Sequence, residues 1–316
     1  MIPRPLRRGP GALRQFAAIG VEHARRRSRG LAARAADAAL ERRRGTALVR
    51  TLGPCLRSGF LAPYARRLCA SAEPAHRELG ALLAAAMADR DDAKALKLAA
   101  TALRGSDRRA EKILSHRYRF LWICNPKAAS RSLIAALRAA DPDALYIRQL
   151  TLEQVHARHP EARSYFSFAF LRHPLQRLRS FYADKHARAR HDRTFYRHFI
   201  RPYHGVRLDM TFGELCRWLD TPCGADAFAD RHWLSQWRQL ADPQGRLPSF
   251  LGRYERLEED WRTLCGRLGL PPTALPRLNP GHPAFLRDAV ADPGIDALVR
   301  RRYARDYEIG GYGAAP

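Results

Sequence analysis

The 316-residue sequence has no apolar stretch that could cross a membrane, because no run approaches the ~18 uninterrupted apolar residues of a transmembrane helix. It also has no secretory signal pattern, since no long apolar region follows the basic start. We therefore expect no transmembrane segment and a cytoplasmic protein, either free or peripheral at the inner membrane surface. An Arg-rich presequence of mitochondrial type stays open, although nothing marks a cleavage site.

Cysteine is scarce as well. The six cysteines include no Cys-x-x-Cys pair and are too sparse for a disulfide scaffold, so we expect reduced thiols. A bridge between Cys216 and Cys223 is the alternative. No His or Cys cluster has the sequence spacing of metal ligands, and the sequence therefore predicts no metal site.

Acidic residues are few, with 31 Asp and Glu against 56 Lys and Arg and a net charge of +25. Residues 1–50 alone hold 13 Arg against Glu22, Asp37 and Glu41. This excess predicts contact with a polyanion or an anionic membrane surface through residues 1–50. The codon bias of a GC-rich genome explains the arginines equally well, so both interpretations stay open.

The sequence does contain strand patterns that alternate with helical ones. Apolar runs at 119–124, 146–147, 167–171 and 250–254 predict strands. Their alternation with helices predicts an α/β fold of three layers, with a P-loop-like, mainly parallel sheet flanked by helices. Two helices are expected within the Ala/Leu-rich residues 75–104, separated near Asp89. The chain accordingly divides into a basic, Ala/Arg-rich helical N-terminal region at 1–111 and an α/β domain at 112–316.

The first motif begins where a predicted strand stops at Asn125-Pro126. Lys127, a loop of small residues and a helix start follow. Such a loop can bind an anion, because unpaired N–H groups and the helix dipole favour negative charge and the lysine adds a full positive charge. A solvated lysine in an ordinary strand-loop-helix is the alternative interpretation.

The second motif follows the predicted strand at 167–171. Pro174 suits the first position of a helix, where its missing N–H costs nothing. Arg172 then lies at the C-terminal end of the strand, and Ser180 lies on the helix. An arginine fork and a hydroxyl can converge there on one phosphate, at the strand ends where open α/β sheets bind ligands.

Together these motifs resemble those of the sulfotransferases that use 3′-phosphoadenosine-5′-phosphosulfate (PAPS). The first resembles the family's 5′-phosphosulfate loop, Pro-Lys-x-Gly/Ala-Ser/Thr-x-Ser/Thr. Arg172, Pro174, Arg177 and Ser180 resemble its 3′-phosphate motif, and Tyr254-Glu255-Arg256-Leu257 is similar to its Tyr-Glu-x-Leu segment beside the adenine. Ala129, where many members have Gly, resembles the carbohydrate-sulfotransferase branch. The resemblance covers about residues 115–312.

The resemblance implies PAPS as donor co-substrate and no metal, with Lys127 stabilising charge on the bridging oxygen. Arg131 departs from the usual small Ser or Thr, and it either contacts phosphate or points to solvent. The Golgi members carry an N-terminal membrane anchor, which we do not expect here. The implied nucleotide-binding residues are Lys127, Ala128, Ala129, Ser130, Arg131, Ser132, Leu133, Arg172, Ser180 and Tyr254.

The acceptor hydroxyl also needs a general base, usually His or Glu in this family. His156 and His159 lie between the two motifs, where relatives with a catalytic histidine carry it, and Glu153 is a third candidate. All three fall on a predicted helix, so exposed side chains without a role are the alternative. His173 has either a packing role or one next to the phosphate.

Two further segments carry weaker signals. The aromatic-rich run His232 to Trp237 either walls an acceptor pocket or is a partly buried helix face. Asn279, in Leu278-Asn279-Pro280, resembles a loop that closes over the nucleotide in relatives.

These motifs predict a sulfotransferase that moves a sulfuryl group from PAPS to a hydroxyl of a carbohydrate, lipid or small-molecule acceptor. A P-loop-type nucleotide kinase is one alternative, although the Gly-x-x-x-x-Gly-Lys-Ser/Thr string is missing. A non-catalytic protein that binds nucleotide or nucleic acid is the other, and only the charge favours it.

Overall fold

The computed structural model describes residues 61–313 except 105, 107, 201–202, 272–273, 277 and 279–292. The basic segment 1–50 and the Asn279 loop therefore lie outside the described residues. The chain forms two compact units. One holds the described residues before 105 together with 197–207 and 221–228, and the other holds the remainder.

Among the described residues before 105, the first unit forms α4 (Ala62–Cys69), α5 (Pro74–Ala88) and α6 (Asp92–Arg104). Two helices within 75–104 were expected, and α5 and α6 confirm them. Helix α5 packs against both neighbours. Gly80 permits the close approach of α4, because a Cβ there would lie 2.7 Å from the Cys69 backbone nitrogen.

The second unit is built on a five-stranded mixed sheet of order β3-β1-β2-β4-β5. Strands β2, β4 and β5 are parallel neighbours, whereas β1 is antiparallel to β2 and β3. The strands are β1 (Lys112–Ser115), β2 (Phe120–Ile123), β3 (Leu145–Ile147), β4 (Phe166–Leu171) and β5 (Phe250–Arg253).

The sheet is mixed because β1, which the sequence-based expectation of a mainly parallel sheet missed, runs antiparallel to both of its neighbours. This strand is four residues long and starts with a lysine, which is rare at buried positions. Lys112 is nevertheless buried. Its ammonium donates hydrogen bonds to the carbonyl oxygens of Ala110 at 2.7 Å and Leu150 at 2.8 Å, which satisfy the charge locally.

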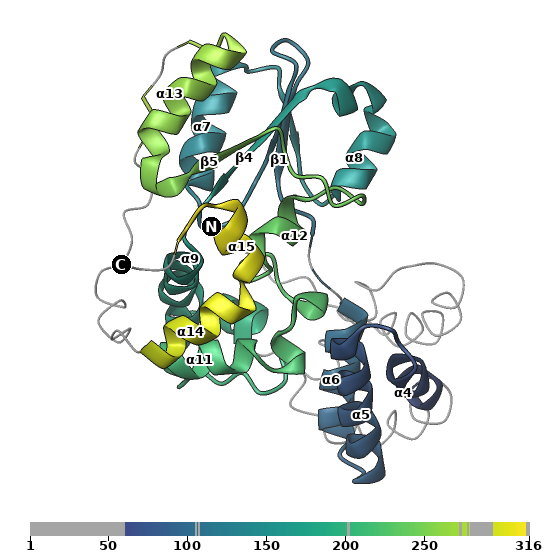
Figure 1. The fold of residues 1–316 in the computed structure, drawn as a ribbon. Helices are drawn as coiled ribbons and strands as arrows, with labels where there is room; N and C mark the ends of the chain where they lie inside the picture. Colours follow the sequence, from purple (N-terminus) through teal and green to yellow (C-terminus); the bar gives the residue numbers. More distant parts are fainter. Residues whose placement is uncertain are drawn as a thin grey trace, which may run out of the picture. The chain divides into compact units, whose positions relative to one another are not determined.

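Helices cover both faces of the sheet, so the second unit is an α/β sandwich. Figure 1 shows α7 (Ser130–Ala140) and α13 (Leu257–Leu268) on one side and α8 (Leu152–Arg158) on the other. Aromatic side chains of β2 and β4 pack beneath α7 and α13 in the main core. Gly252 of β5 leaves room for this core, because a Cβ there would lie 2.5 Å from the Phe170 ring.

The helix boundaries follow local signals. Thr151 and Gln154 form the capping box that starts α8. Pro174 occupies the first turn of α9 (Pro174–Phe181), and Gly269, with φ 66°, ends α13. These three boundaries confirm the sequence-based expectations. Within the described part of the chain, none of the helices is long and apolar enough to span a membrane.

The mainly helical stretch expected at 174–199 is confirmed, but the type of helix changes along it. Helix α9 passes into a π-helical turn at Tyr182–His186 and a 3₁₀ turn at Ala187–Arg190. The remaining helices of this unit are α10 (Arg193–Phe195), α11 (Phe212–Leu219), α12 (Gln236–Leu240), α14 (Pro293–Arg302) and α15 (Ala304–Ile309). The alternative disulfide is not formed, since Cys216 and Cys223 are both free thiols.

Candidate functional site

Three predicted site residues meet at one edge of the sheet. Strands β2, β4 and β5 run parallel side by side, so their carboxyl ends lie at the same edge. The pairing of Leu171 with Arg253 sets Arg172 beside Tyr254, and the guanidinium lies 4.2 Å from the centre of the tyrosine ring. Arg172 Nη1 also donates to the Lys127 carbonyl oxygen at 3.1 Å. The fold thus joins residues from three separate motifs.

The loop after β2 is a tight turn with two left-handed residues. Lys127 has φ 74° and Ala129 has φ 58°. Only glycine adopts this region without cost, which explains why glycine suits position 129. The Ser130 hydroxyl donates to the Asn125 carbonyl at 2.9 Å and closes the turn.

This turn presents the N-terminus of α7 to the site. The first intrahelical bond of α7 runs from the Leu133 amide to the Ala129 carbonyl at 3.0 Å. The amides of Ser130, Arg131 and Ser132 precede that bond and face the helix entrance. The Arg131 side chain is exposed, while Ser132 and Leu133 are buried. Backbone groups of this loop can therefore bind an anion whatever the side chain at 131.

Lys127 makes an ion pair with Asp184, which sits in the π-helical turn after α9. The lysine side chain is only 11% exposed. Burial lowers the pKa of Lys127 to about 8, and the Asp184 carboxylate opposes that shift. Burial resists ionisation of Asp184, but the ammonium of Lys127 and then Lys185 outweigh it and lower the Asp184 pKa to about 2. Sequence reasoning missed Asp184, because only the π-helical turn brings it to the loop.

A buried amide network fixes the strand ends relative to one another. The Asn125 amide donates to Gln236 Oε1 at 2.6 Å and to the Phe170 carbonyl at 2.9 Å. Gln236 Oε1 also accepts from the Arg172 amide at 3.0 Å, and its Nε2 donates to the Arg172 carbonyl at 2.8 Å. The loop, the end of β4 and the start of α12 are therefore one rigid unit.

Arg177, the second arginine of the 3′-phosphate motif, is a structural link. It is 1% exposed, and its guanidinium donates to three carbonyl oxygens. Nε bonds Pro126 at 3.0 Å, Nη1 bonds Leu234 at 2.9 Å and Nη2 bonds Arg231 at 2.8 Å. These bonds hold the segment around residues 231–234 directly against the Lys127 loop.

That segment carries a histidine paired with an aspartate. His232 Nδ1 lies 2.5 Å from Asp230 Oδ1, which also accepts the His232 backbone amide at 2.9 Å. Burial lowers the pKa of His232, while the Asp230 carboxylate opposes the shift. Burial resists ionisation of Asp230 as well, but His232 outweighs it and lowers the Asp230 pKa to about 2. Sequence reasoning considered this run only as aromatic. Trp233 does pack in the interior, with its ring 5.1 Å from that of Phe181.

The side chains predicted to bind phosphate have unused hydrogen-bonding capacity. Arg172 Nε is buried and has no partner among the described residues, and burial lowers the pKa of this arginine. Ser180 is half-buried in the last turn of α9, where its hydroxyl makes no hydrogen bond to another described residue. The structure shows no contact between Ser180 and Arg172. Tyr254 is 38% exposed.

His173 has a packing role. Its backbone amide donates to Glu255 Oε1 at 2.8 Å. Its ring lies 5.1 Å from that of Tyr307 and 5.2 Å from that of Tyr312. The Tyr312 hydroxyl donates in turn to Glu255 Oε2 at 2.9 Å, so these residues brace the start of α9.

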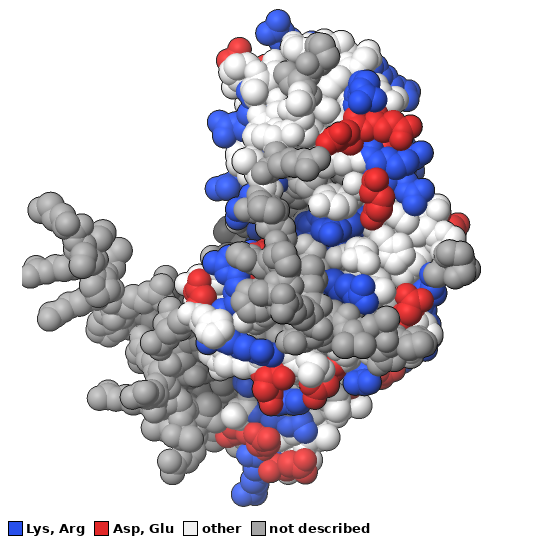
Figure 2. Space-filling view, turned by 90° about the vertical axis from the view of Figure 1, so that its left-hand side faces the viewer, with Lys and Arg blue, Asp and Glu red and all other residues white. Residues whose placement is uncertain are grey.

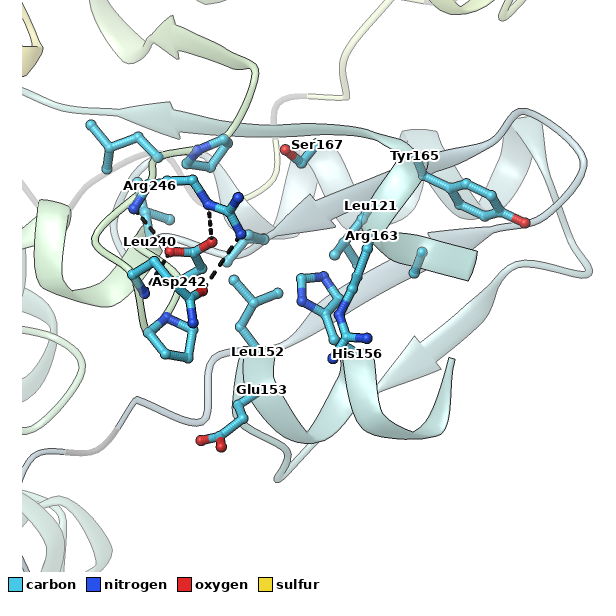
Figure 3. A pocket seen from close by; sticks show the side chains of 16 residues that line it. Leu121, Leu152, Glu153, His156, Arg163, Tyr165, Ser167, Leu240, Asp242 and Arg246 are labelled. Carbon is cyan, nitrogen blue, oxygen red and sulfur yellow. Dashed lines mark hydrogen bonds and ion pairs between the residues drawn. The ribbon is translucent and has the colours of Figure 1, made fainter. Parts of the chain in front are cut away.

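His156 and His159, the predicted general bases, lie on the α8 side of the sheet. His156 lines a pocket of about 530 Å³ together with Glu153 and Arg163 (Figure 3). Burial and then Arg163 lower its pKa. His159 Nδ1 lies 3.7 Å from Glu161 at the surface. Among the described residues, no interaction joins either histidine to Lys127.

Comparisons with known proteins agree with this geometry. A model of the Sulfotransferase family matches residues 111–313, more than half of the chain. Human carbohydrate sulfotransferase 14 (Homo sapiens) is 29% identical over 185 residues, which cover 51% of this chain and 47% of that protein. Human carbohydrate sulfotransferase 10 is 28% identical over 173 residues, 48% of each chain. The chain thus matches about half the length of these curated relatives. No solved structure matches.

Proposed function

The chain belongs to the sulfotransferase family, and from this premise we propose that it transfers a sulfuryl group from PAPS to a hydroxyl of a carbohydrate. The observation that carries the proposal is the meeting of the Lys127 loop, Arg172 and Tyr254 at the carboxyl ends of three parallel strands. The acceptor class comes from the names of the curated relatives. A lipid hydroxyl or a small-molecule hydroxyl is the alternative acceptor for the same sulfuryl transfer.

The donor nucleotide fits these residues as a P-loop-like site. The N-terminus of α7, with the amides of Ser130, Arg131 and Ser132, suits the 5′-phosphosulfate, because a helix N-terminus favours anions. The unpartnered Nε of Arg172 suits the 3′-phosphate, with Ser180 as a second donor. The exposed ring of Tyr254 suits the adenine side. The proposed catalytic domain is residues 112–316.

Lys127 supplies the charge stabilisation of the transfer. As the sulfuryl group leaves, negative charge grows on the oxygen that bridges it to the 5′-phosphate. A largely buried ammonium acts there in a low dielectric and loses little energy to reorganisation. We propose that this ammonium and the loop amides replace a metal ion, so that transfer needs none.

Calorimetric titration with 3′-phosphoadenosine-5′-phosphate (PAP), in the presence of a metal chelator, tests the nucleotide site. Incubation with radiolabelled PAPS and a panel of glycans, lipids and small alcohols tests transfer. We expect saturable binding without metal and label transfer to a glycan. Arg172→Ala should weaken PAP binding more than Ser180→Ala, because a charge-assisted phosphate contact is about twice as strong as a neutral hydrogen bond. Adenosine 5′-phosphosulfate, which lacks the 3′-phosphate, should show no such difference. Binding only with Mg²⁺ would contradict the proposal.

A further inference from the structure

Asp230 and His232 belong to a segment that lies beside the Lys127 loop and that the nucleotide motifs do not include. The bonds from Arg177 to Pro126 and Arg231 attach their segment to the loop. On the other side the His232 ring lies 6.2 Å from that of Phe181, whose helical stretch leads to Asp184. The Lys127 ammonium is near enough to His232 for its charge to lower the pKa of the imidazole.

We propose, building on the function proposed above, that His232 is the general base for the acceptor hydroxyl and that Asp230 is its positioning residue. An ionised carboxylate can only accept, so the 2.5 Å contact assigns a proton to His232 Nδ1. Nε2 is then the basic nitrogen of the ring. The same division of work between a carboxylate and a histidine orients other catalytic imidazoles.

In the proposed transfer, the acceptor oxygen forms a bond to sulfur while its proton passes to His232 Nε2. The bond from sulfur to the bridging oxygen breaks, and its electron pair leaves on the 5′-phosphate of PAP beside the Lys127 ammonium. The products are a sulfate ester, PAP and an imidazolium, which returns its proton to solvent.

The charged groups that face His232 suit this role. Burial lowers the pKa of His232, and the charges of Lys127 and Arg231 act in the same direction, which favours the neutral ring that a base requires. Asp230 opposes them and stabilises the imidazolium once it has formed. The histidines predicted from the sequence have no comparable position, since His156 lines a pocket on the α8 side of the sheet.

The test compares His232→Ala and His232→Gln with His156→Ala, His159→Ala and the exposed control His191→Ala. Glutamine keeps a donor for Asp230 but cannot act as a base. We expect turnover of the best glycan acceptor to fall at least ~10²-fold in both His232 variants, with PAP binding retained. Asp230→Asn should lower kcat and move the acidic limb of the pH profile to lower pH, and Asp230→Glu should restore part of the rate.

Each outcome distinguishes this assignment from the function it rests on. Full turnover by His232→Gln, or loss of turnover in His156→Ala alone, would overturn the assignment of His232 as the general base. Either result would leave the proposed sulfotransferase function intact. An unaltered protein that binds no PAP and transfers no label would overturn both.

A second and independent observation concerns the surface at the β1–β2 turn. His116, His159 and Glu161 offer ligand atoms that all lie within 4.8 Å of one another. Glu161 Oε1 is 3.8 Å from His116 Nδ1 and 3.7 Å from His159 Nδ1. Ligands of one tetrahedral Zn²⁺ ion lie roughly 3.3 Å apart, as follows from Zn–N and Zn–O bonds of about 2.0–2.1 Å. Small side-chain rotations would therefore complete the site.

We infer that these three side chains bind one divalent transition-metal ion, with Zn²⁺ the best match to two imidazoles and a carboxylate. Pro160, between His159 and Glu161, stiffens their segment. The Tyr165 hydroxyl lies 3.0 Å from the same His116 Nδ1, so an ion bound through that nitrogen must displace this contact. Sequence spacing could not reveal the site, because His116 comes from a different turn of the chain.

Calorimetry with ZnCl₂ on the untagged protein at pH 7.5 tests this inference. We expect one saturable site whose affinity falls at least tenfold in His116→Ala, His159→Ala and Glu161→Gln, and not in His191→Ala. Binding should weaken as the pH falls, because protons compete with a metal ion for its ligands. Absent binding, or equal affinity in all variants, would overturn the site. PAP binding in chelator tests the nucleotide site separately.

Discussion

Lys127 keeps a positive charge in a largely buried position, and three features of the chain support it there. The left-handed turn directs it, Asp184 pairs with it, and Arg172 bonds its carbonyl oxygen. Each feature is local to the carboxyl edge of the sheet. The charge is thus placed before substrate arrives, as electrostatic stabilisation of a transition state requires.

Replacing this lysine should affect the chemical step more than binding. We expect Lys127→Ala to lower kcat at least ~10²-fold, the scale seen when one electrostatic stabiliser is removed. PAPS affinity should fall less, because Arg172 and the loop amides remain. Lys127→Arg should not restore the rate, since the planar fork places its charge differently. Single-turnover kinetics beside direct nucleotide binding measure the two effects. Normal turnover at saturating PAPS would reduce Lys127 to a binding residue.

The ion pair with Asp184 predicts a pH effect of definite sign. The reaction needs protonated Lys127, so kcat/KM should fall as pH rises through the lysine pKa of about 8. The Asp184 carboxylate raises that pKa, and its removal must lower it. In Asp184→Asn, the alkaline limb of the profile of kcat/KM against pH should therefore move to lower pH.

The measurement is kcat/KM against pH, which reports the free enzyme. Asp143→Asn, at an exposed position after α7, is the matched control and should leave the limb in place. An unmoved limb in Asp184→Asn would mean that another group titrates there.

Among the elements, the loop between β2 and α7 stores conformational strain. Ala129 holds φ 58°, and a left-handed residue with a Cβ costs about 1–2 kcal/mol. Glycine relieves this cost but loses about 0.5–1 kcal/mol of backbone entropy on folding. We expect Ala129→Gly to stabilise the protein by about 0.5 kcal/mol and to keep PAP binding.

Ala136→Gly, in the interior of the helix α7 that follows this loop, is the contrasting control. Glycine in a helix interior costs about 1 kcal/mol relative to alanine, so this variant should be less stable. Urea denaturation of both variants gives the comparison. Destabilisation by Ala129→Gly as large as that by Ala136→Gly would show that the turn is not strained.

The elements also show what a sequence can predict. Strands β2, β4 and β5, the cap at Thr151 and the stop at Gly269 were predictable because their signals lie within a few residues. The positions of Lys127, Arg172 and Tyr254 at one edge of the sheet were predictable for the same reason, since each lies within a few residues of the end of a strand.

Other features depend on contacts between distant residues, and sequence reasoning missed them. Strand β1 was hidden because a buried lysine begins it. Asp184 reaches Lys127 only through a π-helical turn, a break that the even helical pattern after Pro174 did not indicate. His232 was not predicted as a base because Arg177 links its segment to the loop from far along the chain.

At the scale of the whole molecule, the net charge of +25 remains to be connected with function. On the face shown in Figure 2, Lys and Arg side chains are interspersed with Asp and Glu. The described surface on that side therefore carries its charge diffusely. Such a field attracts polyanions over a distance set by the ionic strength.

This field predicts that binding of an acidic glycan depends on salt. We expect affinity for a labelled hyaluronan oligosaccharide, a carboxylated and unsulfated polyanion, to fall on the order of tenfold between 0.05 and 0.3 M NaCl, as the Debye length shrinks. Neutral chitotetraose should show no such change. Removal of residues 1–50, with their 13 Arg, should flatten the dependence and leave PAP affinity intact. Fluorescence anisotropy measures both ligands. Salt-independent binding of hyaluronan would mean that the arginines reflect codon usage, and that acceptor selection depends on the site alone.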